Sequence, residues 1–264
     1  MKRRDFIASS VALGALALST PDAKADDAPA REYFELRLYH LRRGPKQKLF
    51  DDFYRHAVIP ALNRAGISRI GVFNVLFGPD SPTAYVLIPY KSAEEAVTAT
   101  ERMRADAEFQ KAGAEFINAP ATDPSYVRVE SSFMVAFEGM PKVEVPPGAS
   151  ANAPRIFELR TYESHSKKAN KKKIEMFNNS EIAIFRRTGL RPVFFGETIF
   201  GSKMPNLTYM LTFDNMEQRE KNWGTFVADP EWKKLSTTPG YTDVEIVSNI
   251  TNIFCGQRRT RKFE

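Results

Sequence analysis

The sequence repeats itself once, and this repeat limits the folds that the chain can adopt. Residues 33–41 read YFELRLYHL and residues 156–164 read IFELRTYES, so their shared motif recurs after 123 positions (34 and 157). The same offset relates three further pairs, which are Gly66 and Gly189, Gly78 and Gly201, and residues 105–109 and 228–232. A constant offset over this length indicates a duplicated unit, so each copy must supply the same supersecondary structure.

A proline-rich segment separates the two copies. Residues 138–154 contain four prolines and two glycines, a composition typical of an extended, semi-rigid linker. At about 150 residues per domain, a chain of 264 residues has room for one or two domains. We therefore predict a first repeat over 31–137, a linker over 138–154 and a second repeat over 155–257.

Each copy shows the same order of hydrophobic patterns. In the first copy, residues 32–40 alternate as a strand does, and the apolar residues after Gly44-Pro45 follow a helical spacing up to Gly66. There follow strands over 70–77 and 84–88, a helix capped by Ser92, a short helix from Asp106 and a last strand over 126–137. The order β-α-β-β-α-β is that of the ferredoxin-like fold, so the predicted class is α+β.

These motifs resemble those of a known family. The opening F-E-L-R-x-Y, the glycine after the first helix and the D-P-E-W of residues 229–232 are similar to the NIPSNAP family, twice along the chain. The first copy departs from this pattern at Ala107 and Phe109, where the second has Pro230 and Trp232. The resemblance implies two tandem ferredoxin-like βαββαβ repeats packed sheet to sheet as a pseudo-dimeric α/β barrel.

The opening strand of each copy carries the candidate site. Side chains alternate along a strand, so its polar side chains share one face and the apolar Phe34, Leu36 and Leu38 share the other. We expect the apolar face to lie under the helices and the polar face to line the barrel lumen. The candidate ligand-binding residues of the two copies are Glu35, Arg37, Tyr39, Glu158, Arg160 and Tyr162.

Two interpretations of these six residues stay open. A glutamate and an arginine on one strand face can neutralise each other as part of the fold, and their presence in both copies favours this structural role. Alternatively, an arginine holds an anionic ligand and a tyrosine donates a hydrogen bond to it. The two roles are compatible, and the sequence assigns no catalytic residue.

Three functions remain in view. The favoured one is a module that binds a small organic or anionic ligand in the lumen, where Tyr39, Tyr162, Phe73 and Phe195 supply contact area. A cofactor-independent or haem-dependent oxygenase or isomerase is an alternative that the resemblance implies, and a structural or interaction protein with a filled lumen is another. Because nucleophile, phosphate-loop and zinc-protease motifs are missing from the sequence, it does not decide whether the protein is an enzyme.

The sequence shows no recognisable metal or cofactor site. His40, His56 and His165 lack metal-ligand spacing, and we expect ordinary boundary or surface positions, with His40 on the helix-facing side of its strand. His56 on the first helix would be the haem ligand of the oxygenase alternative. The single cysteine, Cys255, excludes a disulfide framework and is expected to be a buried, inert thiol.

The first 25 residues have the anatomy of an export signal. A basic start precedes a mildly apolar stretch over 7–18, and Ala23-Lys24-Ala25 forms an A-x-A cleavage signal. Arg3-Arg4 with the following Phe6 is similar to the twin-arginine motif, and an ordinary secretory signal is the alternative. We therefore expect cleavage after Ala25 and a periplasmic or secreted bacterial protein.

Charge restricts the partners. The whole chain carries a formal net charge of +6, and without residues 1–25 it keeps 34 basic and 30 acidic residues, or +4. This mild excess does not indicate nucleic-acid binding, and no segment after the signal is apolar enough for a membrane span. The basic run Lys167–Lys173 predicts a solvated helix face, or else a contact with an anionic lipid or partner. A homo-oligomer is left open.

Overall fold

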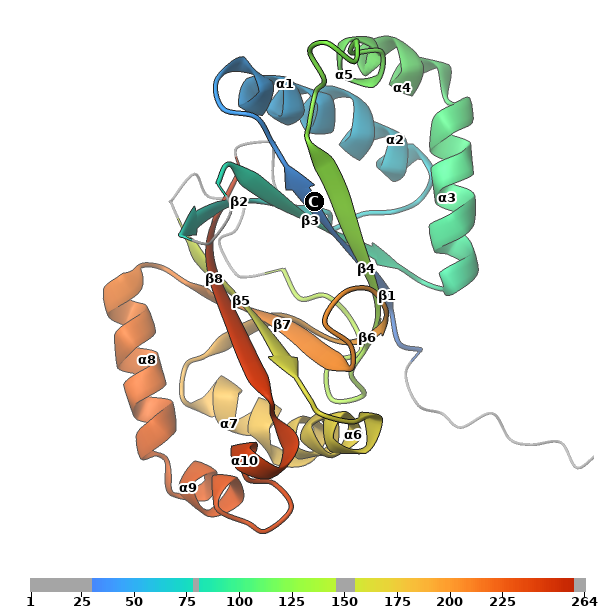
Figure 1. The fold of residues 1–264 in the computed structure, drawn as a ribbon. Coiled ribbons are helices and arrows are strands. Elements are labelled where there is room, and N and C mark those ends of the chain that lie inside the picture. The colour runs from blue at the N-terminus through green and yellow to red at the C-terminus, as the bar shows by residue number, and fades with distance from the viewer. Residues whose placement is uncertain (1–29, 78–80, 146–154, 259–264) are drawn as a thin grey trace, which may run out of the picture.

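The computed structural model describes residues 30–77, 81–145 and 155–258. These residues form a closed barrel of eight antiparallel strands with helices on its outer side (Figure 1). The export signal predicted over residues 1–25 lies outside the described residues, as does part of the predicted linker.

The first repeat supplies half of the barrel. Its strands are β1 (Tyr33–His40), β2 (Gly71–Phe77), β3 (Thr83–Tyr90) and β4 (Arg128–Ala136). Its helices are α1 (Pro45–Phe53), the π-helical turn η1 (Tyr54–Val58), α2 (Ile59–Arg64), α3 (Ala93–Ala105), α4 (Ala107–Ala112) and α5 (Ala114–Ile117). The expected element order is confirmed, and η1 divides the first helix.

The second repeat supplies the other half with the same order. Its strands are β5 (Ile156–Glu163), β6 (Arg191–Phe200), β7 (Asn206–Phe213) and β8 (Asn249–Gln257). Its helices are α6 (Lys167–Met176), the π-helical turn η2 (Phe177–Glu181), α7 (Ile182–Arg187), α8 (Met216–Ala228), α9 (Pro230–Ser236) and α10 (Asp243–Ile246). The π-helical turn recurs at the same place, which shows that the two copies share local detail as well as topology.

Matched residues begin and end the matched helices. Asp106 and Asp229 each accept hydrogen bonds from backbone N–H groups two and three residues later, as N-cap carboxylates do. Gly66 and Gly189 follow the divided helices with φ of 87° and 86°, a left-handed conformation that glycine adopts without strain. The repeated residue types therefore impose the repeated turns.

Strand pairing joins the two repeats into one barrel. The strand order is β1-β3-β2-β8-β5-β7-β6-β4, so β2 pairs with β8 and β4 pairs with β6 across the repeats. The pseudo-dimeric α/β barrel expected from the sequence is confirmed, and its two sheets are joined along both edges. Closure leaves no sheet edge of the barrel unpaired, which removes the usual route to edge-to-edge aggregation.

The described part of the linker is bound to both repeats. The backbone N–H of Val143 donates to Glu32 Oε2 at 2.9 Å, and that of Glu144 donates to the carbonyl oxygen of Val193 at 2.9 Å. The side chain of Val143 is buried with the lumen residues. Residues 138–145 are thus part of the folded body.

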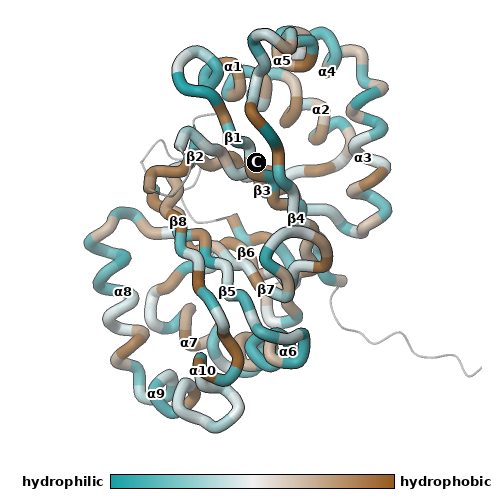
Figure 2. The backbone as a smooth tube through the Cα atoms, in the orientation of Figure 1, coloured by the Kyte–Doolittle hydropathy of each residue, from teal (hydrophilic) through white to brown (hydrophobic). Residues whose placement is uncertain are grey.

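The lumen holds an apolar core to which both repeats contribute. It includes Phe34, Phe73, Phe157, Phe194 and Met210, all without exposed area. Two further large cores lie outside the barrel, one between each sheet and its helices, and a small cluster joins α6 to α10. The outer helices alternate between hydrophilic and hydrophobic segments along their length (Figure 2), and within the described part of the chain no helix is long and apolar enough to cross a membrane.

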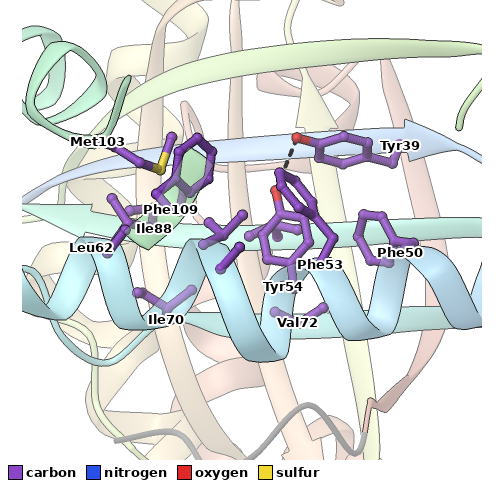
Figure 3. Packing of buried hydrophobic residues seen from close by; sticks show 14 of the residues in the cluster. Tyr39, Phe50, Phe53, Tyr54, Leu62, Ile70, Val72, Ile88, Met103 and Phe109 are labelled. Atoms are coloured by element: carbon purple, nitrogen blue, oxygen red, sulfur yellow. Dashed lines mark hydrogen bonds between the residues drawn. The ribbon is translucent and has the colours of Figure 1, made fainter. Parts of the chain in front are cut away.

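The expected orientation of the opening strand was wrong. Phe34 and Leu36 point into the lumen core, whereas Tyr39 packs beneath the first helix against Phe50 and Tyr54 (Figure 3). Alternation separates the two faces of a strand but does not label them. In this barrel both faces are covered. Bulky apolar side chains occupy most of the lumen, while strand side chains, and in the second repeat also those of α8, complete the polar pairs outside.

We predict that Phe157→Ala lowers the free energy of unfolding by about 3–5 kcal/mol, because it opens a cavity in the lumen core. The side chain of Phe157 has 0% exposure, and its ring centre lies 4.8 Å from that of Phe73. The matched control is Phe77→Ala, whose side chain is 74% exposed and which should change stability by less than about 0.5 kcal/mol. Denaturant unfolding measures both, and equal losses would contradict a lumen that is filled and shared.

Candidate functional site

The structure brings Glu35, Arg37 and Tyr39 together on the outer face of β1. Arg37 donates from Nε and Nη2 to the two carboxylate oxygens of Glu35, both at 2.7 Å. The Ser131 hydroxyl of β4 donates to Glu35 at 2.9 Å, and the Tyr90 hydroxyl of β3 donates to it at 3.1 Å. These three strands thus hold one carboxylate in a fixed place beneath the helices.

Burial and charge act in opposite directions on this pair. Burial raises the pKa of Glu35. The hydrogen bonds and the positive charge of Arg37, together with hydrogen bonds from Ser131 and Tyr90, outweigh burial, so the net pKa of Glu35 is lowered. Burial also raises the pKa of Tyr54, and the neighbouring Tyr39 raises it further. Tyr54 donates to the Tyr39 hydroxyl at 3.0 Å. The pair is therefore ionised near neutral pH, with protonated Tyr54 beside it.

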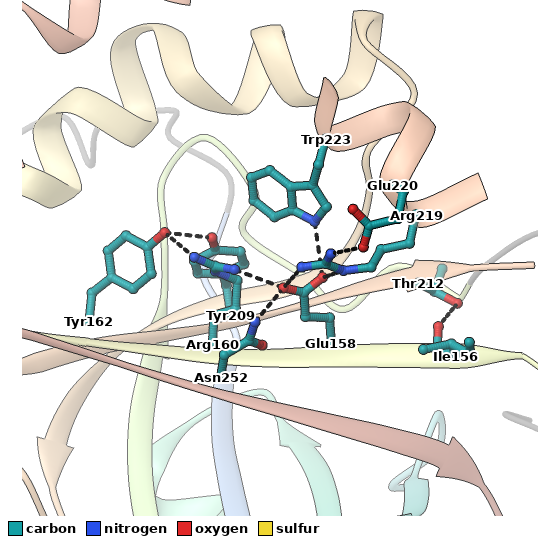
Figure 4. A network of polar contacts seen from close by, with 10 residues as sticks. All are labelled: Ile156, Glu158, Arg160, Tyr162, Tyr209, Thr212, Arg219, Glu220, Trp223 and Asn252. Carbon is teal, nitrogen blue, oxygen red and sulfur yellow. Dashed lines mark hydrogen bonds and ion pairs between the residues drawn. The ribbon is translucent and has the colours of Figure 1, made fainter. Parts of the chain in front are cut away.

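The second repeat builds a denser version of the same cluster around Glu158. Arg160 donates from Nη1 to Glu158 at 2.7 Å, and Asn252 of β8 donates at 2.8 Å. Two residues of α8 also reach the carboxylate: Arg219 donates to both oxygens at 2.8 and 3.0 Å, and Trp223 donates from Nε1 at 3.0 Å. Figure 4 shows these side chains converging on Glu158 from the strand and from the helix above it.

The indole of Trp223 also covers the second arginine. The guanidinium carbon of Arg160 lies 4.8 Å from the centre of the Trp223 ring, a cation–π contact. Arg160 donates from Nη2 to the Tyr162 hydroxyl at 3.1 Å, and Tyr209 donates to the same hydroxyl at 3.2 Å. Burial raises the pKa of Glu158, but the arginine and tryptophan donors overcome this, and its net pKa is lowered.

The two clusters differ in what lies above them. At the 123-residue offset, Ala96 and Thr100 of α3 stand where α8 has Arg219 and Trp223. A cavity of about 450 Å³ opens beside the first cluster. Its lining includes Glu35, Arg37 and Tyr39 of β1 with Thr100, Met103 and Arg104 of α3. The Glu35 side chain keeps 18% of its area exposed, whereas Glu158 has 0%. The side chains of Arg37 and Arg160 are covered alike, with 14% and 15% of their area exposed, so the difference lies at the carboxylate. We call the first site open and the second filled.

The expected lumen position of the six candidate residues is therefore wrong. Each glutamate and arginine lies between its sheet and its helices, where the two tyrosines also pack. Among the aromatic residues expected in the lumen, Phe73 lies there and Phe195 lies under the helices. The six residues do form one polar cluster per repeat, but the clusters are on opposite outer sides of the barrel.

A second cavity lies within the barrel, at one end of the lumen. It has a volume of about 220 Å³ and is lined by apolar residues such as Leu36, Leu159 and Ile253 and by polar residues that include His40 and Lys203. His40 Nε2 lies 2.7 Å from Glu130 Oε1. His40 was expected on the helix-facing side and in fact faces the lumen, for the same reason as Leu36.

The other titratable candidates occupy ordinary positions. His56 and His165 are exposed and line neither cavity. Cys255 is buried as expected, and burial raises the pKa of its thiol to about 12. The described residues hold no group of three or more histidine, cysteine or acidic side chains that could bind a metal ion.

The basic run is a solvated face only in part. Lys171 pairs with Glu197 and Lys172 with Glu175 near the surface. Lys173 is 1% exposed, and its ammonium lies 3.3 Å from the buried Glu181. Its expected solvation was therefore wrong, because the helix turns this lysine toward the sheet and an acidic partner compensates its charge.

Sequence reasoning missed the residues that complete the clusters. Tyr90, Ser131 and Asn252 follow from strand pairing, since Ser131 is opposite Arg37 and Asn252 is opposite Arg160. Arg219 and Trp223 could be found only by knowing that α8 packs on the outer face of β5. The sequence signal available was the difference itself: two large side chains in one copy replace alanine and threonine in the other.

The fold defines the class of this protein as a dimeric α/β barrel in which one chain supplies both halves. Similar solved structures include candidate monooxygenases from Fusobacterium nucleatum (TM-score 0.57, 8% identity, covering 87% of this chain and 93% of that chain) and Lactobacillus acidophilus (TM-score 0.58, 9% identity, 86% and 94%). A NIPSNAP-like domain protein from Burkholderia xenovorans is 20% identical, with a TM-score of 0.34, over 38% of this chain and 82% of that chain.

The family follows from the sequence of each repeat. The NIPSNAP family profile matches residues 34–138 and again residues 157–253, so the chain belongs to the NIPSNAP family. No curated protein matches the chain. The likeness to the two monooxygenase candidates, at 8% and 9% identity, shows a shared fold.

We predict that Glu158→Gln lowers the free energy of unfolding by about 3–5 kcal/mol at pH 7, because Arg160 and Arg219 lose their buried carboxylate. The lowered pKa of Glu158 means that its carboxylate stabilises the fold above its ordinary pKa of 4.5 and loses this effect as the pH falls through the folded-state pKa. The difference in the free energy of unfolding between wild type and variant should therefore become smaller below about pH 4.5.

The matched control is Glu220→Gln, which also removes a carboxylate that pairs with Arg219. The Glu220 side chain is exposed, so the loss should stay below about 1 kcal/mol. Denaturant unfolding between pH 3 and 8 measures both variants. A Glu158→Gln deficit that stays constant down to pH 3 would contradict the ionised, hydrogen-bonded state described above.

Proposed function

We propose that this protein binds a small organic anion in the cavity between β1 and α3 of the first repeat. The observation that carries the proposal is the contrast between two matched clusters, one filled by the protein's own side chains and one open. A cavity of about 450 Å³ is within the range of small-molecule sites. The fold does not need this space, because the second repeat closes it.

The lining of the cavity favours an anion with an apolar body. Glu35 and Arg37 neutralise each other, so the remaining formal charge is that of Arg104 at the rim. The offset places Val227 at the matching point of α8, which makes this arginine a feature of the first repeat. Met103 and Phe109 supply apolar surface, and a carboxylate or sulfonate would pair with Arg104.

The alternatives rest on less. The oxygenase or isomerase alternative is supported by the fold likeness to monooxygenase candidates, and fold alone does not define function, so we assign no catalytic residue or cofactor. A structural protein with a filled lumen agrees with the apolar core inside the barrel but does not explain the cavity under α3.

The test fills the cavity with the side chains of the second repeat. We expect the wild type to bind one equivalent of 8-anilinonaphthalene-1-sulfonate, a fluorescent aromatic anion, and the double variant Ala96→Arg/Thr100→Trp to lose this binding. Arg104→Ala should weaken binding about fivefold to tenfold, since an ion pair at a partly wet rim contributes about 1 kcal/mol. Val97→Ala is the control, because Val97 lies on α3, is 64% exposed and does not line the cavity.

Fluorescence titration measures the affinity and stoichiometry of each variant, and thermal unfolding checks that each is folded. If the double variant binds the dye as tightly as the wild type, the dye occupies another place and the proposal is wrong. If Val97→Ala weakens binding as much as Arg104→Ala, the role given to Arg104 is wrong.

We also propose that the protein is exported and that residues 1–25 are removed. The support is the basic start, the apolar stretch and the A-x-A signal of the sequence. We expect the chain in the periplasm of a bacterial host to begin at Asp26, as amino-terminal sequencing would show. Replacing Arg3 and Arg4 by lysines should retain the protein in the cytoplasm, and unchanged export would favour an ordinary secretory signal.

A further inference from the structure

The filled site of the second repeat shows what the open site can hold. We infer that the ligand of the first repeat is a planar aromatic ring with an N–H donor, such as an indole, which stacks on Arg37 and donates to Glu35 while its acidic substituent reaches Arg104. This inference rests on the proposed function and specifies the ligand class for the same site. It treats Trp223 as an internal model of that ligand.

The backbones around the two sites are equivalent. Glu35 and Glu158 occupy the same register on β1 and β5, each followed two residues later by its arginine. The helices α3 and α8 both have 13 residues, and their N-caps, Ser92 and Asn215, accept from the backbone N–H three residues later. Position 100 therefore stands over the first pair as position 223 stands over the second.

Trp223 makes two contacts that a free ligand could reproduce. Its Nε1 donates to Glu158 at 3.0 Å, and its ring lies 4.8 Å from the guanidinium carbon of Arg160. A buried arginine face favours an aromatic ring because the ring's quadrupole attracts the cation. Thr100 offers neither a ring nor a donor of that reach, and its hydroxyl donates instead to the carbonyl oxygen of Ala96.

The arginine geometry of the two sites fits an exchange of partners. In the open site Arg37 uses two nitrogens on Glu35, at 2.7 Å each. In the filled site Arg160 donates to Glu158 only from Nη1, and the remaining acceptor positions of the Glu158 carboxylate are taken by Arg219 and Trp223 of α8. A ring N–H can therefore replace one Arg37 contact, and the freed guanidinium turns its face to the ring.

The charges that line the cavity determine why the substituent of the ligand is acidic. The second repeat places the cation Arg219 against Glu158, and the first repeat has Ala96 there. A ligand cation could take that place, but Glu35 is already neutralised by Arg37 and accepts from Tyr90 and Ser131. Arg104 is a cation on the cavity lining, so an anionic group is the better complement.

Isothermal titration with three probes tests the inference on the intact protein. Indole-3-acetate has the ring, the N–H and the carboxylate, 1-methylindole-3-acetate lacks the N–H, and tryptamine replaces the carboxylate by a cation. We expect indole-3-acetate to bind at one site per chain, N-methylation to weaken it about tenfold or more, and tryptamine to bind at least tenfold more weakly. The Ala96→Arg/Thr100→Trp variant should bind none of them.

The converse variant opens the second site. Arg219→Ala/Trp223→Thr/Val227→Arg should raise the stoichiometry for indole-3-acetate from one to two, since it removes the internal ring, exposes Glu158 and Arg160, and supplies at position 227 the cation that Arg104 provides in the first repeat. Circular dichroism checks its folding, and the probe comparison needs only the wild type, so the inference stays testable if this variant unfolds.

Equal affinity of the methylated and unmethylated indoles would overturn the assigned donor, and tighter binding of tryptamine would overturn the assigned charge. If no indole binds while the wild type still binds anilinonaphthalene sulfonate and the filled variant does not, the ligand class is wrong and the proposed function stands. If neither the indoles nor the dye distinguish the wild type from the filled variant, both the ligand class and the proposed function are wrong.

Discussion

A carboxylate paired with a guanidinium beneath helices is the interaction on which this molecule depends. Burying two charges is costly unless their hydrogen bonds are made and their charges compensated. In each repeat the glutamate and arginine of the opening strand achieve this with donors from neighbouring strands, and in the second repeat also with α8. The positions of the helices over the sheets are therefore tied to one polar cluster per repeat.

Duplication within one chain allows the two clusters to differ. A homodimeric barrel must build both sites identically, whereas a tandem chain can fill one and open the other. Here Arg219 and Trp223 close the second site, and Ala96 and Thr100 leave space in the first. The shared lumen core links the repeats, so the two different sites belong to one folded body.

The sequence predicted the element order and the helix caps because these follow from local patterns and from the repeat, and it predicted the duplicated barrel through its resemblance to the NIPSNAP family. It placed Glu35 and Arg37 on one face of β1 but assigned that face to the lumen. Both faces of the sheets are covered, as the buried patterns of β3 and β7 show, so polarity alone does not distinguish the lumen face from the helix face. It could not foresee that Trp223 reaches Glu158, because the rotation of α8 over β5 is decided by packing rather than by spacing.

The central claim is that the first repeat has an open ligand site and the second has a filled one. A crystal structure of the protein soaked with 4-iodobenzoate tests this most directly, because anomalous scattering locates the iodine without any assumption about the pose. The account predicts one iodine position per chain, between β1 and α3 beside Arg37. Iodine under α8 with equal occupancy, or solely at the lumen end beside His40, would contradict it.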